Sequence, residues 1–132
     1  MGKFEFITEF EINASHKILY PYLNSASGLA QWFADDVNIN EDKIFSFIWD
    51  GEEHLAKKAG QKLNHWVRFE FLPETDEDKD DPSYIELKID VNDLTQTLFL
   101  QVTDYSDLDD EEEQQELWEN LVLNLKELIG GR

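Results

Sequence analysis

The segment SYIELKIDVNDLTQTLFLQVT, residues 83–103, gives the clearest indication of how this chain folds. Apolar side chains occupy every second position on both sides of Asn92-Asp93: Ile85, Leu87, Ile89 and Val91 before it, Leu98, Leu100 and Val102 after it. A period of two is typical of half-buried strands. We predict an antiparallel hairpin with a two-residue turn at Asn92-Asp93, which places Leu87 opposite Leu98 on one apolar face.

A helix is predicted to cover that face. The segment DDEEEQQELWENLVLNLKELI, from Asp109 to Ile129, carries apolar side chains at helical spacing: Trp118, Val122, Leu125 and Ile129, with Leu117, Leu121 and Leu128 widening the stripe. Asp109 and Glu112 have the spacing of a capping box at the start of the segment. A helix of this length spans about 30 Å, which is enough to cross a whole sheet.

The remaining strands follow from the same alternation and from turn residues. They are predicted at residues 4–12, 37–40, 43–49, 52–59 and 64–71. Asp50-Gly51 indicates a two-residue hairpin turn, because such turns require positive φ. A turn near Gly60 is expected to place His54 opposite Phe69. The next hairpin places Phe69 beside Ile85, so that the strands share a wide apolar face.

Two short helices are predicted before the hairpins. Ser15 is a candidate N-cap for the first, and Pro21 is expected to kink or shorten that helix. Ser27 introduces a second helical turn over residues 28–33. The acidic stretch 73–82 is bounded by prolines and is predicted to be a loop. The predicted class is therefore α+β, with a curved antiparallel sheet of about seven strands and a long C-terminal helix.

The composition limits the classes of partner. The 30 acidic residues against 11 basic ones give a formal charge of −19. This charge disfavours binding to nucleic acid and to anionic membranes. The sequence has no cysteine, no apolar run of membrane-spanning length and no recognisable signal peptide. We expect a cytoplasmic protein, monomeric or weakly dimeric, without membrane insertion and without a cofactor.

Three short motifs in a fixed order carry a family resemblance: SGLAQWF at 27–33, FIWDG at 47–51, and LQVTD at 100–104 ahead of the helix with Trp118. The chain resembles the START and birch-pollen-allergen (SRPBCC) superfamily, in particular proteins akin to the C-terminal domain of the activator of the ninety-kilodalton heat-shock ATPase. The resemblance covers residues 1–132 as one domain and implies a helix-grip fold. It also implies a cavity between sheet and long helix, used by relatives for lipids, hormones or polyketides, without implying a shared reaction.

The candidate ligand-binding residues are the large side chains expected around that cavity: Trp32, Phe33, Phe47, Trp49, His54, Phe69, Leu87, Leu100, Trp118 and Val122. Such side chains either line an open pocket or fill a packed core, as aromatic residues usually do. His54 is either a cavity residue that hydrogen-bonds a ligand or acts as a general base, or a strand histidine satisfied by the backbone. The sequence leaves both alternatives open.

Metal binding and catalysis find little support in the sequence. The histidines, His16, His54 and His65, are not expected to share one metal sphere. Residues 76–87 match only the first ligands of a calcium loop, because Asp81 and Leu87 stand where glycine and glutamate are required. We therefore predict no catalytic and no metal-binding residues.

Two functions are consistent with these features. The first is a binding module whose hydrophobic cavity takes a small apolar or amphipathic ligand, lipid-like or polyketide-like. The alternative is a chaperone-cofactor-like domain that binds a protein through its acidic surface or a sheet edge. An enzyme ranks last, because it requires at least two convergent titratable groups in the cavity.

Overall fold

The computed structural model of the protein describes residues 2–130 and contains one seven-stranded antiparallel sheet with four helices. The elements are β1 (Phe4–Ile12), α1 (His16–Asn24), α2 (Ala26–Leu29), β2 (Asp36–Ile39), β3 (Ile44–Trp49), β4 (Glu52–Lys62), β5 (Trp66–Phe71), α3 (Asp76–Asp80), β6 (Tyr84–Asn92), β7 (Thr97–Ser106) and α4 (Glu111–Leu128). The strand order is β1-β7-β6-β5-β4-β3-β2, so β1 and β2 form the edges of the open sheet.

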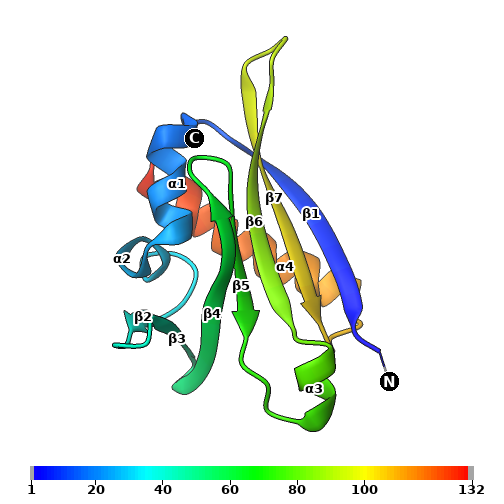
Figure 1. Ribbon diagram of the computed structural model, residues 1–132. Helices are drawn as coiled ribbons and strands as arrows, with labels where there is room; N and C mark the ends of the chain where they lie inside the picture. The colour runs from blue at the N-terminus through cyan, green and yellow to red at the C-terminus, as the bar shows by residue number, and fades with distance from the viewer. Residues whose placement is uncertain (1, 131–132) are drawn as a thin grey trace.

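The long helix α4 lies across one face of the curved sheet, and α1 and α2 lie near its C-terminal end (Figure 1). Trp118, Val122 and Leu125 of α4 are buried against the sheet. The predicted α+β helix-grip architecture is therefore confirmed. Within residues 2–130, no helix is both long and apolar enough to span a membrane.

The β6–β7 hairpin keeps the predicted apolar face but not the predicted register. Leu87 pairs with Val102, and Leu98 pairs with Val91, so the predicted pairing of Leu87 with Leu98 is wrong. The turn is longer than predicted because Asn92 Oδ1 accepts hydrogen bonds from the backbone of the following residues. An even shift in register leaves every side chain on its original face, and Leu87 and Leu98 are both buried.

The β3–β4 and β5–β6 pairings agree with the sequence. Asp50 and Gly51 have φ values of 51° and 80° and form the predicted two-residue turn. Phe69 pairs with Ile85. On the outer face, Arg68 pairs with Glu86, with 3.9 Å between Nη1 and Oε1.

The predicted turn at Gly60 is wrong. β4 continues to Lys62 and is irregular between Lys58 and Gly60. On the β5 side, Phe69 pairs with Lys58 and not with His54. On the β3 side, His54 pairs with Phe47, as the Asp50-Gly51 turn requires. Gly60 is needed for a close approach, since a Cβ placed there would lie 2.9 Å from Cη2 of Trp66.

The helices in the first third of the chain differ from the prediction by a few residues. Ser15 caps α1 as predicted, and Pro21 lies inside that helix. The N-cap of α2 is Ser25, whose Oγ accepts from the amide of Gly28, and not Ser27.

Two predictions about the acidic segments also need correction. The stretch 73–82 is not only a loop, because it contains the short helix α3. The N-cap of α4 is Asp110, which accepts from the amide of Glu113, instead of the predicted Asp109 and Glu112 pair. Leu117 and Leu128 are exposed, so the buried stripe of α4 is narrower than predicted.

Candidate functional site

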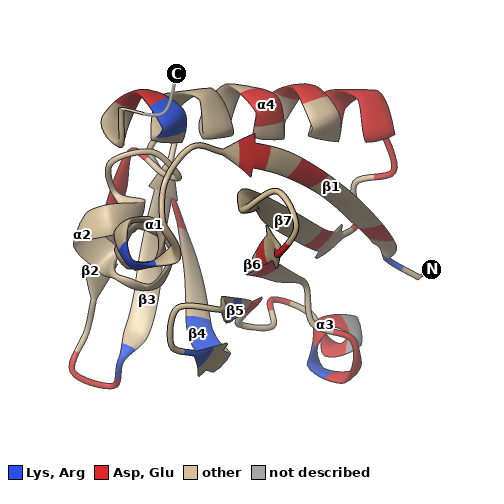
Figure 2. Cartoon of the chain, turned by 90° about the horizontal axis from the view of Figure 1, so that it is seen from above, with Lys and Arg blue, Asp and Glu red and all other residues tan. Residues whose placement is uncertain are grey.

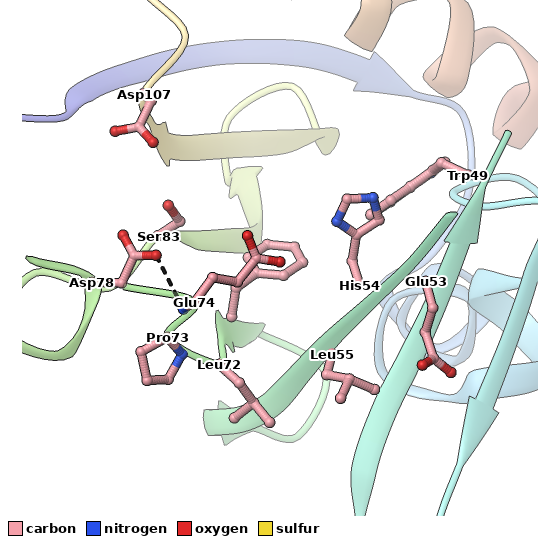
Figure 3. Close-up of a pocket in the computed structure, with 11 residues that line it drawn as sticks. Trp49, Glu53, His54, Leu55, Leu72, Pro73, Glu74, Asp78, Ser83 and Asp107 are labelled. Atoms are coloured by element: carbon pink, nitrogen blue, oxygen red, sulfur yellow. Dashed lines mark hydrogen bonds between the residues drawn. The ribbon is translucent and has the colours of Figure 1, made fainter. Parts of the chain in front are cut away.

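An open pocket lies at one end of the sheet, between the β3–β4 hairpin and the segment that carries α3 (Figure 3). We call it the rim pocket; its volume is about 480 Å³. It is lined by Trp49, Glu53, His54, Leu55, Phe71, Leu72, Pro73, Glu74, Asp78, Ser83 and Asp107. One wall therefore comes from paired strands, and the other from connecting segments.

The strand wall is aromatic. Trp49 ends β3, and its indole Nε1 donates a 2.7 Å hydrogen bond to the carbonyl of Phe33, which fixes the ring. The Trp49 and His54 ring centroids lie 5.2 Å apart, and those of Trp49 and Phe71 lie 6.5 Å apart. All three side chains are partly exposed. They offer flat apolar surface to a ligand without being sealed in the core.

The opposite wall is acidic. It carries Glu74, Asp78 and Asp107 together with Ser83, while the side chain of Glu74 extends toward the middle of the pocket (Figure 3). Asp78 is held in place by Lys3, whose Nζ donates to Oδ1 at 2.8 Å, and by the amide of Glu74. The hydrogen bond from Lys3 is the main reason why the pKa of Asp78 lies below its ordinary value.

The segment that forms this wall is tied to the sheet at two further points. Lys3 also donates to the backbone carbonyl of Asp81. The hydroxyl of Tyr105 donates to both carboxylate oxygens of Asp81, at 2.8 and 2.9 Å. The hydrogen bond to Asp81 raises the pKa of the Tyr105 phenol. These contacts set the distance between the acidic wall and the aromatic wall.

Behind the rim pocket, aromatic side chains fill the space between sheet and α4. Phe33 stacks on Trp118 with 5.7 Å between centroids and meets the edges of Phe47 and Trp49 at 5.3 and 5.2 Å. Phe47 in turn packs against Phe69. Except for Trp49, these rings are buried. This part of the predicted cavity is a packed core.

The carboxylate of Asp104 lies at the edge of that core, near the start of α4, where Trp118 hydrogen-bonds to it. The indole Nε1 of Trp118 donates to Oδ2 of Asp104 at 2.9 Å. Burial raises the pKa of Asp104, and the hydrogen bond from Trp118 opposes the rise. Gln114 is 1% exposed, and its Nε2 has no hydrogen-bond partner within the described chain. The geometry suits a structural carboxylate more than a catalytic one, because the group is held away from the pocket lining.

The predicted ligand-binding residues separate into two groups. Trp49 and His54 line the rim pocket. The others are buried in the hydrophobic core behind it: Trp32, Phe33, Phe47, Phe69, Leu87, Leu100, Trp118 and Val122. Their role in ligand binding stays a prediction.

Sequence reasoning missed the acidic half of the pocket. Glu74 and Asp78 belong to the stretch 73–82, which was predicted to be a loop and matched a calcium loop only in its first ligands, and Asp107 was given no role. Phe71 was assigned to a strand but not to a site.

A second pocket lies at the other end of the sheet, with a volume of about 660 Å³. It is lined by Glu11–His16 and by Val91, Thr95, Gln96, Thr97 and Leu98, with a more polar surface than the rim pocket. It lacks an aromatic wall. We therefore take the rim pocket as the candidate site.

The side chains that were considered for metal binding are not gathered into a site. Among the side chains that the structure describes, no group of three or more His, Asp or Glu is arranged to hold a metal ion. His54 Nε2 lies 3.9 Å from Glu52 Oε2, at an exposed position on β4. One imidazole beside the aromatic wall can donate or accept a hydrogen bond.

Comparison with known proteins places the chain in a wider group. The family model of the START-like superfamily domain matches residues 1–131. No protein with curated annotation matches the sequence.

Solved structures agree with this match. A protein from Bacteroides fragilis is 30% identical, with a TM-score of 0.64 and coverage of 100% of this chain and 94% of that chain. The Aha1 dimer from Colwellia psychrerythraea is 17% identical, with a TM-score of 0.75 and 96% of each chain covered. DynU16, from the dynemicin biosynthetic locus, is 13% identical, with a TM-score of 0.68; 96% of this chain and 47% of that chain are covered. At these identities, the last two comparisons show a common fold.

Proposed function

Because the chain belongs to the START-like superfamily, we propose that it is a single-domain binding module for a small amphipathic molecule, held in the rim pocket. The observation that supports this most directly is the position of Trp49. Its ring borders the pocket and is packed from behind by Phe33 and Phe47. Small-molecule sites are concave and combine apolar and aromatic side chains with polar groups that orient the ligand.

The packed interior limits the size of the ligand. Trp118, Phe33 and Phe47 occupy the space between sheet and helix and are at most 1% exposed. A lipid chain buried along α4 would have to displace these rings, at a cost of several kcal/mol for each large apolar side chain removed from a packed core. We therefore propose a compact ligand with an apolar body placed against Trp49 and Phe71. His54 is proposed to hydrogen-bond its polar part.

Native mass spectrometry of freshly purified protein tests this function. We expect a retained small molecule whose occupancy falls in Trp49→Ala. Trp66→Ala is the matched control, because Trp66 lies on the opposite face of the sheet, beside Gly60. Equal occupancy in the two variants would count against the rim pocket, and a chain that neither retains nor takes up any small molecule would count against the function.

Protein binding is the second candidate function, and one surface favours it. The outward side of α4 carries many carboxylates (Figure 2). Leu117, Leu123 and Leu128 are exposed on the same helix. We propose that a basic amphipathic segment of another protein is the kind of partner this surface would take.

A pulldown at two salt concentrations separates this candidate from the first. A partner held by the acidic surface should be retained at low salt and lost at high salt. Retention that is insensitive to salt would contradict an electrostatic interface. The cytoplasmic location and the monomeric or weakly dimeric state remain predictions.

A further inference from the structure

We propose that the rim pocket selects cationic amphipathic molecules: an amine or quaternary ammonium group carried on a compact aromatic or aliphatic body. This inference rests on the proposed function and specifies its ligand class. It differs from the sequence-based expectation of a lipid-like or polyketide-like ligand, whose polar end is usually neutral or anionic.

The charges that line the pocket carry the first part of the argument. Its lining includes carboxylates from four residues, Glu53, Glu74, Asp78 and Asp107, and contains no lysine or arginine. Two of these carboxylates already have partners. Asp78 is bound by Lys3, and Glu53 accepts a 2.6 Å hydrogen bond from the hydroxyl of Ser46 on the outer face of the sheet.

Glu74 and Asp107 are the carboxylates that remain for a ligand. Both are exposed, and among residues 2–130 neither side chain forms a salt bridge or a hydrogen bond. They come from different segments, one after β5 and one after β7, so the fold brings them to the same opening (Figure 3). A cation bound in this opening would be attracted by both carboxylates.

The aromatic wall supplies the second part. Trp49 and Phe71 line the same pocket as the two carboxylates, and both are partly exposed. A ring face attracts an ammonium group through its quadrupole, and tryptophan does so most strongly. The same ring packs against an apolar body. A ligand with both features therefore finds complementary surface on both walls.

The net negative charge of the protein also attracts cations, but it does not explain why a cation would bind at the rim pocket in particular. With a formal charge of −19, the whole surface raises the local concentration of any cation and lowers that of any anion. If the rim pocket itself selects cations, removing the charges of Glu74 and Asp107 must lower the affinity for a cationic ligand more than removing two negative charges elsewhere. The experiment must therefore include such a control.

Three probes of similar shape test the inference: naphthylethylamine, naphthylethanol and naphthylacetate. Each is titrated into the protein at neutral pH while the indole N–H signal of Trp49 and the amide signals of His54 and Phe71 are followed by NMR. We expect the amine to shift these signals and to bind about tenfold more tightly than the alcohol, with little binding of the acid.

A pair of double variants separates local from global charge. Glu74→Gln with Asp107→Asn should bring the affinity for the amine down to that for the alcohol and leave the alcohol unchanged. Glu119→Gln with Asp90→Asn removes the same charge from exposed positions outside the pocket lining and should retain most of the preference.

The possible results distinguish the two proposals. If amine and alcohol bind the rim pocket equally, or if both double variants lose the preference to the same extent, the cationic ligand class is wrong and the binding module stands. If none of the three probes shifts the rim-pocket signals, or if the shifts map elsewhere, the binding function assigned to the rim pocket is wrong as well.

Discussion

Lys3 and Asp78 are 75 residues apart in sequence, and their side chains meet at 2.8 Å. The contact joins the residue just before β1 to helix α3, and it orders the segment that forms the acidic wall of the rim pocket. The side chain of Lys3 is only 5% exposed. The shape of the pocket therefore depends on a contact that no local sequence pattern predicts.

Replacing Lys3 should loosen the acidic wall. In Lys3→Met, the Asp78 carboxylate and the Asp81 carbonyl lose their common donor. We expect faster amide hydrogen exchange at 74–81 and little change at β6, because the effect is a local opening. Low pH should have a similar effect. The pKa of Asp78 is lowered in the folded state, so its contribution is complete above the unfolded value and is lost as pH falls through the folded value.

Lys79→Met is the matched control for this prediction. It removes an equal charge, but Lys79 is well exposed, and its Nζ lies 3.5 Å from Oδ1 of Asp76 within the same short helix. Equal acceleration of exchange in the two variants would show that net charge, and not the Lys3 contact, sets the mobility of the segment.

Asp104 should make stability fall as pH rises. Burial raises its pKa above the ordinary 3.8, so the folded state holds the proton more tightly than the unfolded state. The stability supplied by Asp104 is greatest at low pH and declines as pH rises from the unfolded value through the raised folded value. Asp104→Asn keeps an acceptor for Trp118 without a charge to bury. We expect the variant to lack this decline in urea unfolding measured from about pH 4 to pH 7.

Two further variants make the Asp104 prediction specific. Asp104→Leu leaves the indole N–H of Trp118 without an acceptor and should destabilise by about 1–3 kcal/mol. Asp90→Asn removes an exposed carboxylate and should leave the decline unchanged. A slope in Asp104→Asn identical to that of the parent protein would contradict the assignment.

Trp49→Phe should weaken the aromatic wall without removing it. The substitution keeps a ring at the pocket but leaves the carbonyl of Phe33 without its 2.7 Å donor. We expect a loss of about 1 kcal/mol in the free energy of unfolding, measured by urea denaturation. Trp32→Phe removes a comparable indole bond, to the carbonyl of Tyr22 at 2.8 Å, from outside the pocket lining.

The two tryptophan variants should differ in ligand binding. Only Trp49→Phe is expected to weaken the binding of naphthylethylamine, because phenylalanine attracts a cation less strongly than tryptophan does. Equal weakening in Trp32→Phe would indicate that general destabilisation is responsible.

Strand faces were predictable from the sequence because the pleat has a period of two. In β6 and β7, the actual turn shifts the register by an even number of positions, so Leu87 and Leu98 remain on the buried face although they do not pair. The pairing itself was not predictable. It depends on side-chain hydrogen bonds of Asn92 within the turn, and alternation carries no information about these.

The rim pocket was only half predictable for a related reason. Trp49 and His54 stand next to the Asp50-Gly51 turn, whose chemistry fixes both strands locally. Glu74 and Asp107 occupy connecting segments whose positions depend on contacts of Lys3 and Tyr105 with residues far along the chain. Long-range contacts of this kind produce no periodic pattern in the sequence, so they could not be predicted from it.

Gly60 illustrates how one residue type carries two meanings. Glycine is common in turns because it accepts positive φ, but positive φ in this chain is found at Gly51 and not at Gly60. Gly60 lies within β4, where the indole of Trp66 covers its backbone. Glycine is required at position 60 because a side chain would collide with Trp66. Substitutions can separate this role from the adoption of positive φ in a turn.

Gly60→Ala should destabilise by about 1–2 kcal/mol, because the added Cβ forces Trp66 out of its position. Combining it with Trp66→Leu should remove most of this penalty, which a double-mutant cycle of urea unfolding measures as a coupling energy. Gly51→Ala should cost a similar amount, since its φ of 80° is unfavourable for alanine, but should show no coupling with Trp66→Leu. Coupling of equal size at both glycines, or none at Gly60, would mean that the close approach to Trp66 does not explain the glycine.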